Sequence, residues 1–278
     1  MVAGSPNGGR EVRVMYQHRF VVVIAVAALM IGGGLAAEEK ALYDKDAQAV
    51  ANRAFADLAA WRNDSAKKYL EKNKGEYGGT PAYQAAWALL EIQEGSDGNK
   101  AKTTKALNSL SDSSKSGSFS AAALYYKGEV LHQQNDRKGA EAAWQAALNN
   151  ARSVADKDPT DATAQYYLGA ALVRAKKFAE ARDALLIAVR AGFDPAMVNY
   201  QIGLSYLFGE SWDQARAAFD LGLAVDPRFA PMYFWRAMAW DKLGRKDSML
   251  LDLDQYLKLA PNGPEAGKAR AVLKSAGR

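Results

Sequence analysis

The segment Ala196–Phe229, AMVNYQIGLSYLFGESWDQARAAFDLGLAVDPRF, determines the fold class because its pattern recurs in the residues on either side. Matching residues return at one fixed interval in three columns: Gly169, Gly203 and Ala237; Ala181, Ala215 and Met249; Leu185, Phe219 and Leu253. Four prolines, Pro159, Pro195, Pro227 and Pro261, follow at similar intervals. A period of about 34 residues indicates stacked helix pairs.

Burial explains why such pairs stack. Ile202 and Tyr206 lie at helical spacing in the first helix of the pair, and Ala215 and Phe219 do so in the second. One isolated pair cannot cover all of these apolar side chains, so neighbouring pairs must pack against each other. A proline cannot continue a helix and therefore ends the second helix of each pair.

The quoted segment resembles the tetratricopeptide repeat consensus. The resemblance rests on seven columns, at positions 8, 11, 17, 20, 24, 27 and 32: Gly203, Tyr206, Trp212, Ala215, Phe219, Gly222 and Pro227. It implies an all-α fold, a right-handed superhelix of antiparallel helix pairs. We expect the repeats to occupy residues 118–263, in copies at about 121–159, 162–195, 196–229 and 230–263.

The copies differ in length. In the first, Gly128, Ala140, Trp144 and Ala147 each precede their counterparts by a longer interval than the later copies show. The additional residues, around Ala151–Lys157, are compatible with a helix, and they predict a second helix lengthened by about two turns. The second copy, 162–195, carries two extra residues before its Asp-Pro.

Helical segments are also expected on both sides of the repeats. Residues 264–278 predict a capping helix with charged residues around a small apolar face. Residues 37–117 predict two degenerate hairpins, Glu38–Ala60 with Asp64–Lys74 and Pro81–Glu94 with Asp97–Leu110. They either continue the superhelix or form a separate small bundle. The serine-rich stretch Ser111–Ser120 is a candidate flexible break.

Residues 1–36 have the features of a secretory signal peptide. His18 and Arg19 precede twelve apolar residues, Phe20–Ile31, and the small-residue exit ends at Ala36, where we expect cleavage. Met15 is an alternative start. Cleavage predicts a periplasmic protein without stable membrane insertion. The alternative is an uncleaved anchor in the inner membrane, with the repeats facing the periplasm.

Composition argues against several functions. Removing residues 1–36 leaves a formal charge of +3 without a clustered basic stripe, so we expect no nucleic-acid partner. The chain has no cysteine, and His132 is the one histidine after residue 36. A nucleophilic triad would depend on His132 alone, which we expect to face solvent or cap a helix, and a zinc site with His or Cys ligands needs several such residues. We therefore predict a protein that is not an enzyme and holds no cofactor or metal.

The family resemblance implies that positions 2, 5, 9 and 12 of each first helix line a concave groove. The predicted partner-binding residues come from positions 5 and 9: Tyr125, Tyr166, Tyr200, Leu204, Phe234 and Met238. They predict an apolar groove rimmed by aromatic rings, which suits a peptide or helix of another envelope protein. The protein would then be an interaction scaffold in assembly of an envelope complex. Two alternatives remain: the rings serve packing alone, or the protein is a glycan-binding accessory of the cell wall, which needs polar groups beside the rings.

Overall fold

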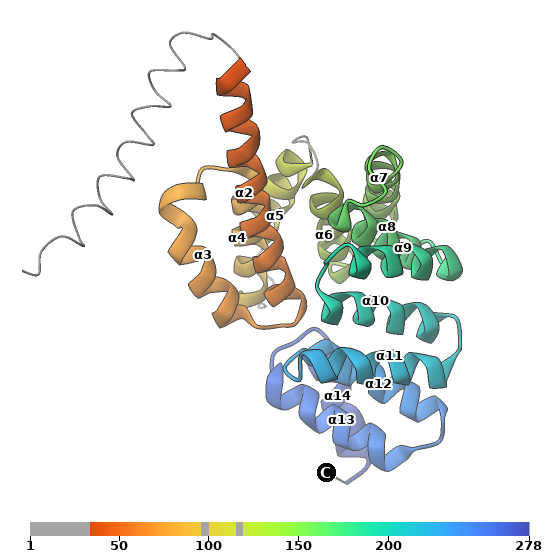
Figure 1. The fold of residues 1–278 in the computed structure, drawn as a ribbon. Helices are drawn as coiled ribbons and strands as arrows, with labels where there is room; N and C mark the ends of the chain where they lie inside the picture. The colour runs from red at the N-terminus through yellow and green to blue at the C-terminus, as the bar shows by residue number, and fades with distance from the viewer. Residues whose placement is uncertain (1–33, 96–99, 115–118, 278) are drawn as a thin grey trace, which may run out of the picture. The chain divides into compact units, whose positions relative to one another are not determined.

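The computed structural model describes residues 34–95, 100–114 and 119–277, and within these ranges the chain folds into thirteen helices without a strand (Figure 1). The predicted signal peptide therefore lies almost entirely outside the described residues. The chain divides into two compact units, Met1–Asp46 and Ala47–Arg278. Helix α2 (Gly34–Ala59) begins in the first unit and ends in the second. The second unit holds the repeats.

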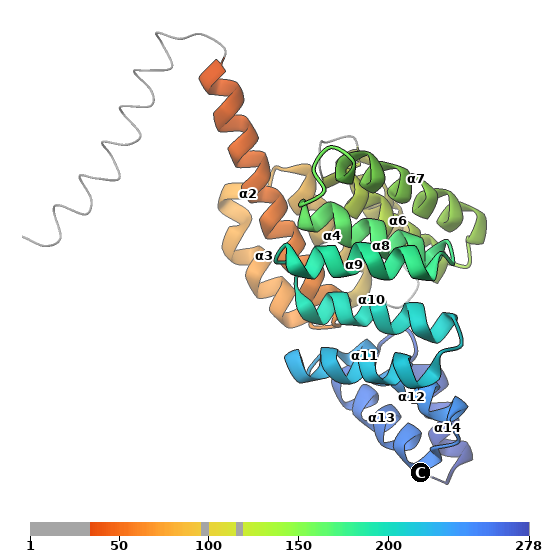
Figure 2. The ribbon, with the colours of Figure 1, turned by 45° about the vertical axis from the view of Figure 1, so that its right-hand side comes forward.

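Four consecutive antiparallel helix pairs form the regular part of this unit, as the all-α prediction requires. They are α6 (Ser120–Gln133) with α7 (Arg137–Ala155), α8 (Ala162–Arg174) with α9 (Phe178–Arg190), α10 (Pro195–Phe208) with α11 (Trp212–Val225), and α12 (Ala230–Lys242) with α13 (Lys246–Leu259). Each pair packs on the one before it, through α7 and α8, α9 and α10, and α11 and α12 (Figure 2). This arrangement is a helical solenoid.

Small residues allow the two helices of a pair to approach closely. A Cβ atom placed on Gly203 would lie 2.4 Å from the Cε1 atom of the Phe219 ring, and one on Gly169 would lie 2.5 Å from Cγ of Leu185. Ala215 is completely buried. These columns therefore repeat because the helix axes leave no room for larger side chains, which confirms the register expected from the sequence.

The turn inside each pair has a recurring backbone conformation. Asn135, Lys176, Glu210 and Gly244 all have a positive φ, between 59° and 71°, and they occupy the same place in the four pairs. A residue in the left-handed region reverses the chain between two helices within a short turn. Only Gly244 takes this conformation without the usual steric cost.

The predicted irregularities agree with the observed helices. Helix α7 has 19 residues, whereas α9, α11 and α13 have 13 or 14, so the insertion lengthens the second helix as expected. Helix α14 (Ala266–Ser275) packs on α13 and buries Ala266, Ala269 and Leu273, while Lys268 and Lys274 are exposed. It covers the apolar end of the array.

The helices before α6 are α2, α3 (Asn63–Tyr77), α4 (Pro81–Glu94) and α5 (Lys100–Ser113). Successive members pack from α3 to α6. Helix α5 continues through Ser113, so the first part of the serine-rich stretch is helical, and residues 115–118 lie outside the described ranges. Among the helices described, none combines the length and the hydrophobicity needed to cross a bilayer.

Candidate functional site

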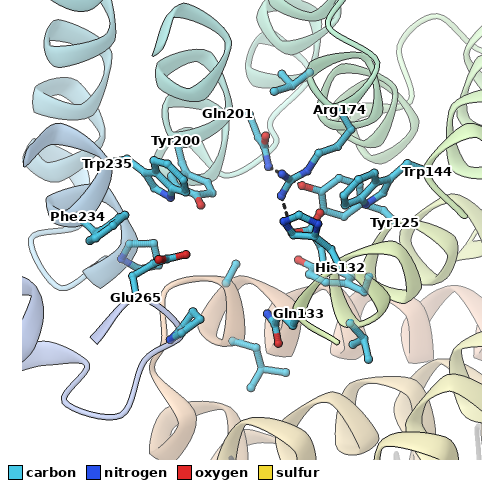
Figure 3. A pocket seen from close by; sticks show the side chains of 18 of the residues that line it. Tyr125, His132, Gln133, Trp144, Arg174, Tyr200, Gln201, Phe234, Trp235 and Glu265 are labelled. Atoms are coloured by element: carbon cyan, nitrogen blue, oxygen red, sulfur yellow. Dashed lines mark hydrogen bonds and ion pairs between the residues drawn. The ribbon is translucent and has the colours of Figure 1, made fainter. Parts of the chain in front are cut away.

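A cavity of about 820 Å³ lies among the first helices of the repeats. Residues from α6, α8, α10 and α12 line most of it, and the end of α2 with the following turn contributes Leu58, Ala59 and Trp61. Pockets of this volume are typical of ligand sites in proteins. Figure 3 shows its side chains in two groups, which we call the aromatic side and the polar side.

The aromatic side consists of Tyr200, Phe234 and Trp235, with Phe208 beside them. The ring of Trp235 meets Phe234 edge-on at 5.3 Å and Phe208 at 5.7 Å, measured between ring centroids. Phe208 is 39% exposed, which is unusual for a phenylalanine, whereas Phe234 is buried. This side therefore offers rings that a partner can cover.

The polar side is centred on Arg174. Its Nη2 lies 2.5 Å from Oε2 of Glu129, and its guanidinium lies 4.7 Å from the centre of the Trp144 ring. The side chains of Arg174 and Glu129 are each about one-fifth exposed. Next to them, Nε2 of Gln201 donates a hydrogen bond of 3.1 Å to the hydroxyl of Tyr125.

The polar side adds charged and amide groups to the cavity, which the prediction of an apolar groove did not include. Arg174 and Gln201 stand at positions 13 and 6 of their repeats, outside the columns used for the prediction. The sequence has an arginine, Arg174, at position 13 of the second repeat. Only the folded chain brings it next to Glu129, which lies 45 positions earlier.

Burial and neighbouring charges change the protonation of these groups. Burial raises the pKa of Tyr125 to about 12, and the nearby Glu129 carboxylate adds to the rise. Burial acts to lower the pKa of Arg174, but the Glu129 carboxylate together with Tyr125 and Tyr200 more than offsets it, so the pKa lies above its ordinary value. Arg174 is therefore charged, and Tyr125 is a neutral hydroxyl at physiological pH.

The predicted groove residues fall into two groups. Tyr125, Tyr166, Tyr200 and Phe234 line the cavity, whereas Leu204 and Met238 do not. Tyr166 is only 2% exposed and stacks on Phe193 at 4.1 Å between ring centroids. Leu204 is also buried. Most of the predicted residues are therefore buried in packing contacts. Among the predicted aromatic residues, Tyr200 is partly exposed and also lines the cavity.

His132 lies on the cavity wall, with its ring centroid 5.5 Å from that of Trp144. In the described ranges no group of three or more His, Cys, Asp or Glu side chains is placed to hold a metal ion.

One residue of the cavity wall, Trp61, belongs to a contact between distant parts of the chain, which we call the clasp. It consists of Asp57, Ala60, Trp61 and Arg62, around the α2–α3 turn, and of Asp226 and Ala230, around the α11–α12 turn. Arg62 Nη1 pairs with Oδ2 of Asp226, and the Ala230 amide donates a 3.3 Å hydrogen bond to the Ala60 carbonyl. The clasp joins the first described hairpin to the junction between the third and fourth repeats.

Comparisons with known proteins agree with this fold. The family model described as Tetratricopeptide repeat matches residues 98–151, 144–195 and 200–264, together more than half of the chain. No curated protein matches the sequence.

Several solved structures are similar to the chain. TTC0263, a thermophilic TPR protein of Thermus thermophilus, is 18% identical with a TM-score of 0.54, and the match covers 70% of this chain and 99% of that one. MamA (41-end) from Desulfovibrio magneticus RS-1 is 19% identical with a TM-score of 0.40, covering 64% and 96%. Pseudomonas aeruginosa pilF is 19% identical with a TM-score of 0.36, covering 82% and 98%. At these identities the likeness concerns the fold.

Proposed function

Because the chain belongs to the tetratricopeptide repeat family, whose members are generally non-enzymatic scaffolds for protein–protein interactions, we propose that it binds a peptide or helix of another cell-envelope protein in the cavity. The observation that carries this proposal is the pairing of a partly exposed aromatic side with a charged and amide side across a cavity of about 820 Å³. A helix about 10 Å across fills roughly 420 Å³ per turn, so the site suits a short segment of about two turns.

Each side of the cavity has a role in such binding. Tryptophan, tyrosine and arginine dominate the energetic centres of protein interfaces, and Trp235, Tyr200 and Arg174 face the same cavity. Arg174 and Gln201 have donors suited to peptide carbonyl groups. Because Glu129 already neutralises Arg174, we expect a segment without a terminal carboxylate at this point.

Site-specific photocrosslinking tests the proposal. A photoreactive phenylalanine replaces Phe208 at the cavity wall, and the matched control replaces Leu221, which is 61% exposed and does not line the cavity. We expect a defined partner peptide, identified by mass spectrometry after crosslinking in cells, at Phe208 and not at Leu221. The same products at both positions, or none at Phe208, would count against binding in the cavity.

The envelope location is part of this proposal and rests on residues 1–36. Their basic start, apolar middle and small-residue exit support export and cleavage after Ala36, which would release the repeats into the periplasm. Without cleavage, the same residues would anchor the repeats at the inner membrane. In both cases the partner is a protein of the envelope.

A glycan of the cell wall is the second candidate ligand, and the polar side of the cavity favours it. Arg174, Glu129 and Gln201 stand near aromatic rings, and sugar rings are held by this combination of hydrogen-bonding groups and ring faces. Sedimentation with purified cell-wall sacculi separates the two candidates. Co-sedimentation that Trp235→Ala abolishes, together with no protein crosslink at Phe208, would favour the glycan.

A further inference from the structure

We propose that the exposed surface of α9, α11 and α13, which we call the outer face, binds a second copy of this chain. These helices are the second members of three successive pairs. The main cavity is lined mostly by the first helices, and no residue of α11 lines it. The outer face is therefore separate from the ligand site, and this proposal is independent of the function proposed for that site.

Large apolar side chains remain exposed on the outer face. The described part of the chain exposes seven such side chains, and five of them belong to these three helices: Leu186, Ile187, Leu221, Val225 and Leu251. Of the other two, Phe208 lines the cavity and Leu42 is on α2. Ile187 and Leu221 occupy the same place in successive repeats. Exposed apolar side chains that gather on one surface are typical of interaction sites.

Charged side chains flank these apolar ones. Each helix has an exposed acid toward its N-terminal end and an exposed base at or just after its C-terminal end: Asp183 and Arg190 for α9, Asp213 and Arg228 for α11, and Asp247 and Lys258 for α13. Within residues 34–95, 100–114 and 119–277, none of these six side chains forms an ion pair or a hydrogen bond. Their charges are therefore available to a partner.

On α11 the exposed leucine lies midway between the two charges. Leu221 comes eight positions after Asp213 and seven positions before Arg228. The same order of acid, apolar residue and base holds on α9 and α13. An acid near the start of a helix and a base near its end also stabilise the single helix through its dipole. The dipole does not account for an exposed leucine between them, whereas an interface does.

This order is complementary to itself in one orientation. A two-fold axis that runs across the helices places each helix antiparallel on its own copy. Asp213 then faces Arg228 of the second copy, and the two Leu221 side chains meet near the axis. A two-fold axis along the helices would instead bring acid against acid and base against base, which costs free energy. Charge complementarity therefore favours a homodimer in which the α11 helices are antiparallel.

Sedimentation equilibrium of the protein purified from its host tests the proposal over a range of micromolar concentrations. We expect a reversible dimer, and we expect Leu221→Glu to raise its dissociation constant by about tenfold or more, because two glutamates would meet near the axis. Leu42→Glu is the matched control, since Leu42 is also 61% exposed but lies on α2, and it should leave the constant unchanged. A monomer at every concentration, or equal constants for the two variants, would overturn the proposal.

A charge exchange keeps the test decisive if Leu221→Glu fails to fold. Asp213→Lys alone should weaken the dimer, and adding Arg228→Asp should restore it, because each exchanged charge again meets its opposite. A role of Asp213 in the helix dipole alone predicts no such restoration. The photoreactive variant at Leu221 should also yield two copies of the chain joined through α11, a product distinct from the partner peptide expected at Phe208. Failure of the restoration, or a crosslink from Leu221 only to a different protein, would contradict self-association.

Discussion

At the scale of single residues, the fold depends on side chains that are small enough for two helices to meet. Ala215 is completely buried, and Gly203 leaves no space for a methyl group beside Phe219. These positions were predictable, because the same close approach recurs once in every repeat. The pairing of Arg174 with Glu129 was not, because the residue types at these two positions differ from repeat to repeat and the pair joins two different repeats.

The first prediction concerns Ala215→Leu. The added atoms have no space between α10 and α11, so we expect a loss of ~1–3 kcal/mol in the free energy of unfolding through overpacking. Chemical denaturation measures it. Ala217→Leu is the control, because Ala217 is exposed on the same helix and should leave the midpoint nearly unchanged. An unaltered midpoint and slope for Ala215→Leu would place that residue on the surface.

At the scale of helices, charges join the third repeat to the fourth. Arg236 of α12 donates to both carboxylate oxygens of Asp252 on α13, at 2.8 and 2.6 Å, and to Asp220 on α11 at 2.7 Å. The Asp252 side chain is 8% exposed. Burial raises the pKa of Asp252, and Arg236 opposes that rise. The guanidinium thus stabilises a carboxylate that water barely reaches.

The second prediction compares two arginines of this network. Arg236→Ala should cost about 1.5–3 kcal/mol of stability, because it leaves a nearly buried acceptor without its charged donor. Arg216→Ala removes an exposed pair with Asp220, at 2.6 Å, and should cost about 0.3–0.5 kcal/mol. Urea denaturation of both variants tests this order. Equal losses would mean that Asp252 finds another donor or becomes protonated.

Tyrosine rings connect the first helices α6 and α8. Tyr126 and Tyr167 have centroids 6.1 Å apart, and Tyr166 meets Tyr167 edge-on at 5.0 Å. Burial raises the pKa of all three hydroxyls well above the ordinary value. The folded state therefore holds these protons more tightly than the unfolded state does.

The third prediction follows from this difference. The stability from neutral tyrosines is fully present below about pH 10, the pKa of the unfolded side chain, and is lost as the pH rises toward and through the folded values. For Tyr125 the folded value is about 12. We expect the urea midpoint to fall steeply above about pH 10, and some tyrosines to ionise, by ultraviolet absorbance, only as the helical signal is lost. Ionisation of all tyrosines near pH 10 in folded protein would contradict this.

At the scale of the whole molecule, the sequence predicts the repeated part and misses the clasp. The sequence period reflects contacts between neighbouring repeats, because each repeat places the same types of residue at the positions that contact its neighbour. The pair of Arg62 and Asp226 joins positions 164 apart in the sequence and occurs once, so no column marks it. The aromatic positions recur in the repeats and could therefore be predicted. The α2–α3 turn lies outside the repeats, so the sequence contained no sign that Trp61 lines the cavity.

The fourth prediction concerns the full-length chain in its native host. If Gly34–Ala36 is a cleavage exit, intact-mass analysis should find a mature protein that begins at Ala37 or Glu38. The periplasmic fraction should contain it. A product that keeps Phe20–Ile31 and remains with the membranes would instead identify an anchored protein.

The clasp also limits the duplications and deletions of helix pairs that leave this contact intact. Arrays of this kind ordinarily tolerate duplication or deletion of a unit, since each repeat contacts only its neighbours. Here the carbonyl of Ala60 meets the amide of Ala230, so the number of helix pairs between these residues sets the span that the clasp must close. One additional pair would carry Asp226 away from Arg62. The number of helix pairs in this part of the chain therefore decides whether the clasp can form.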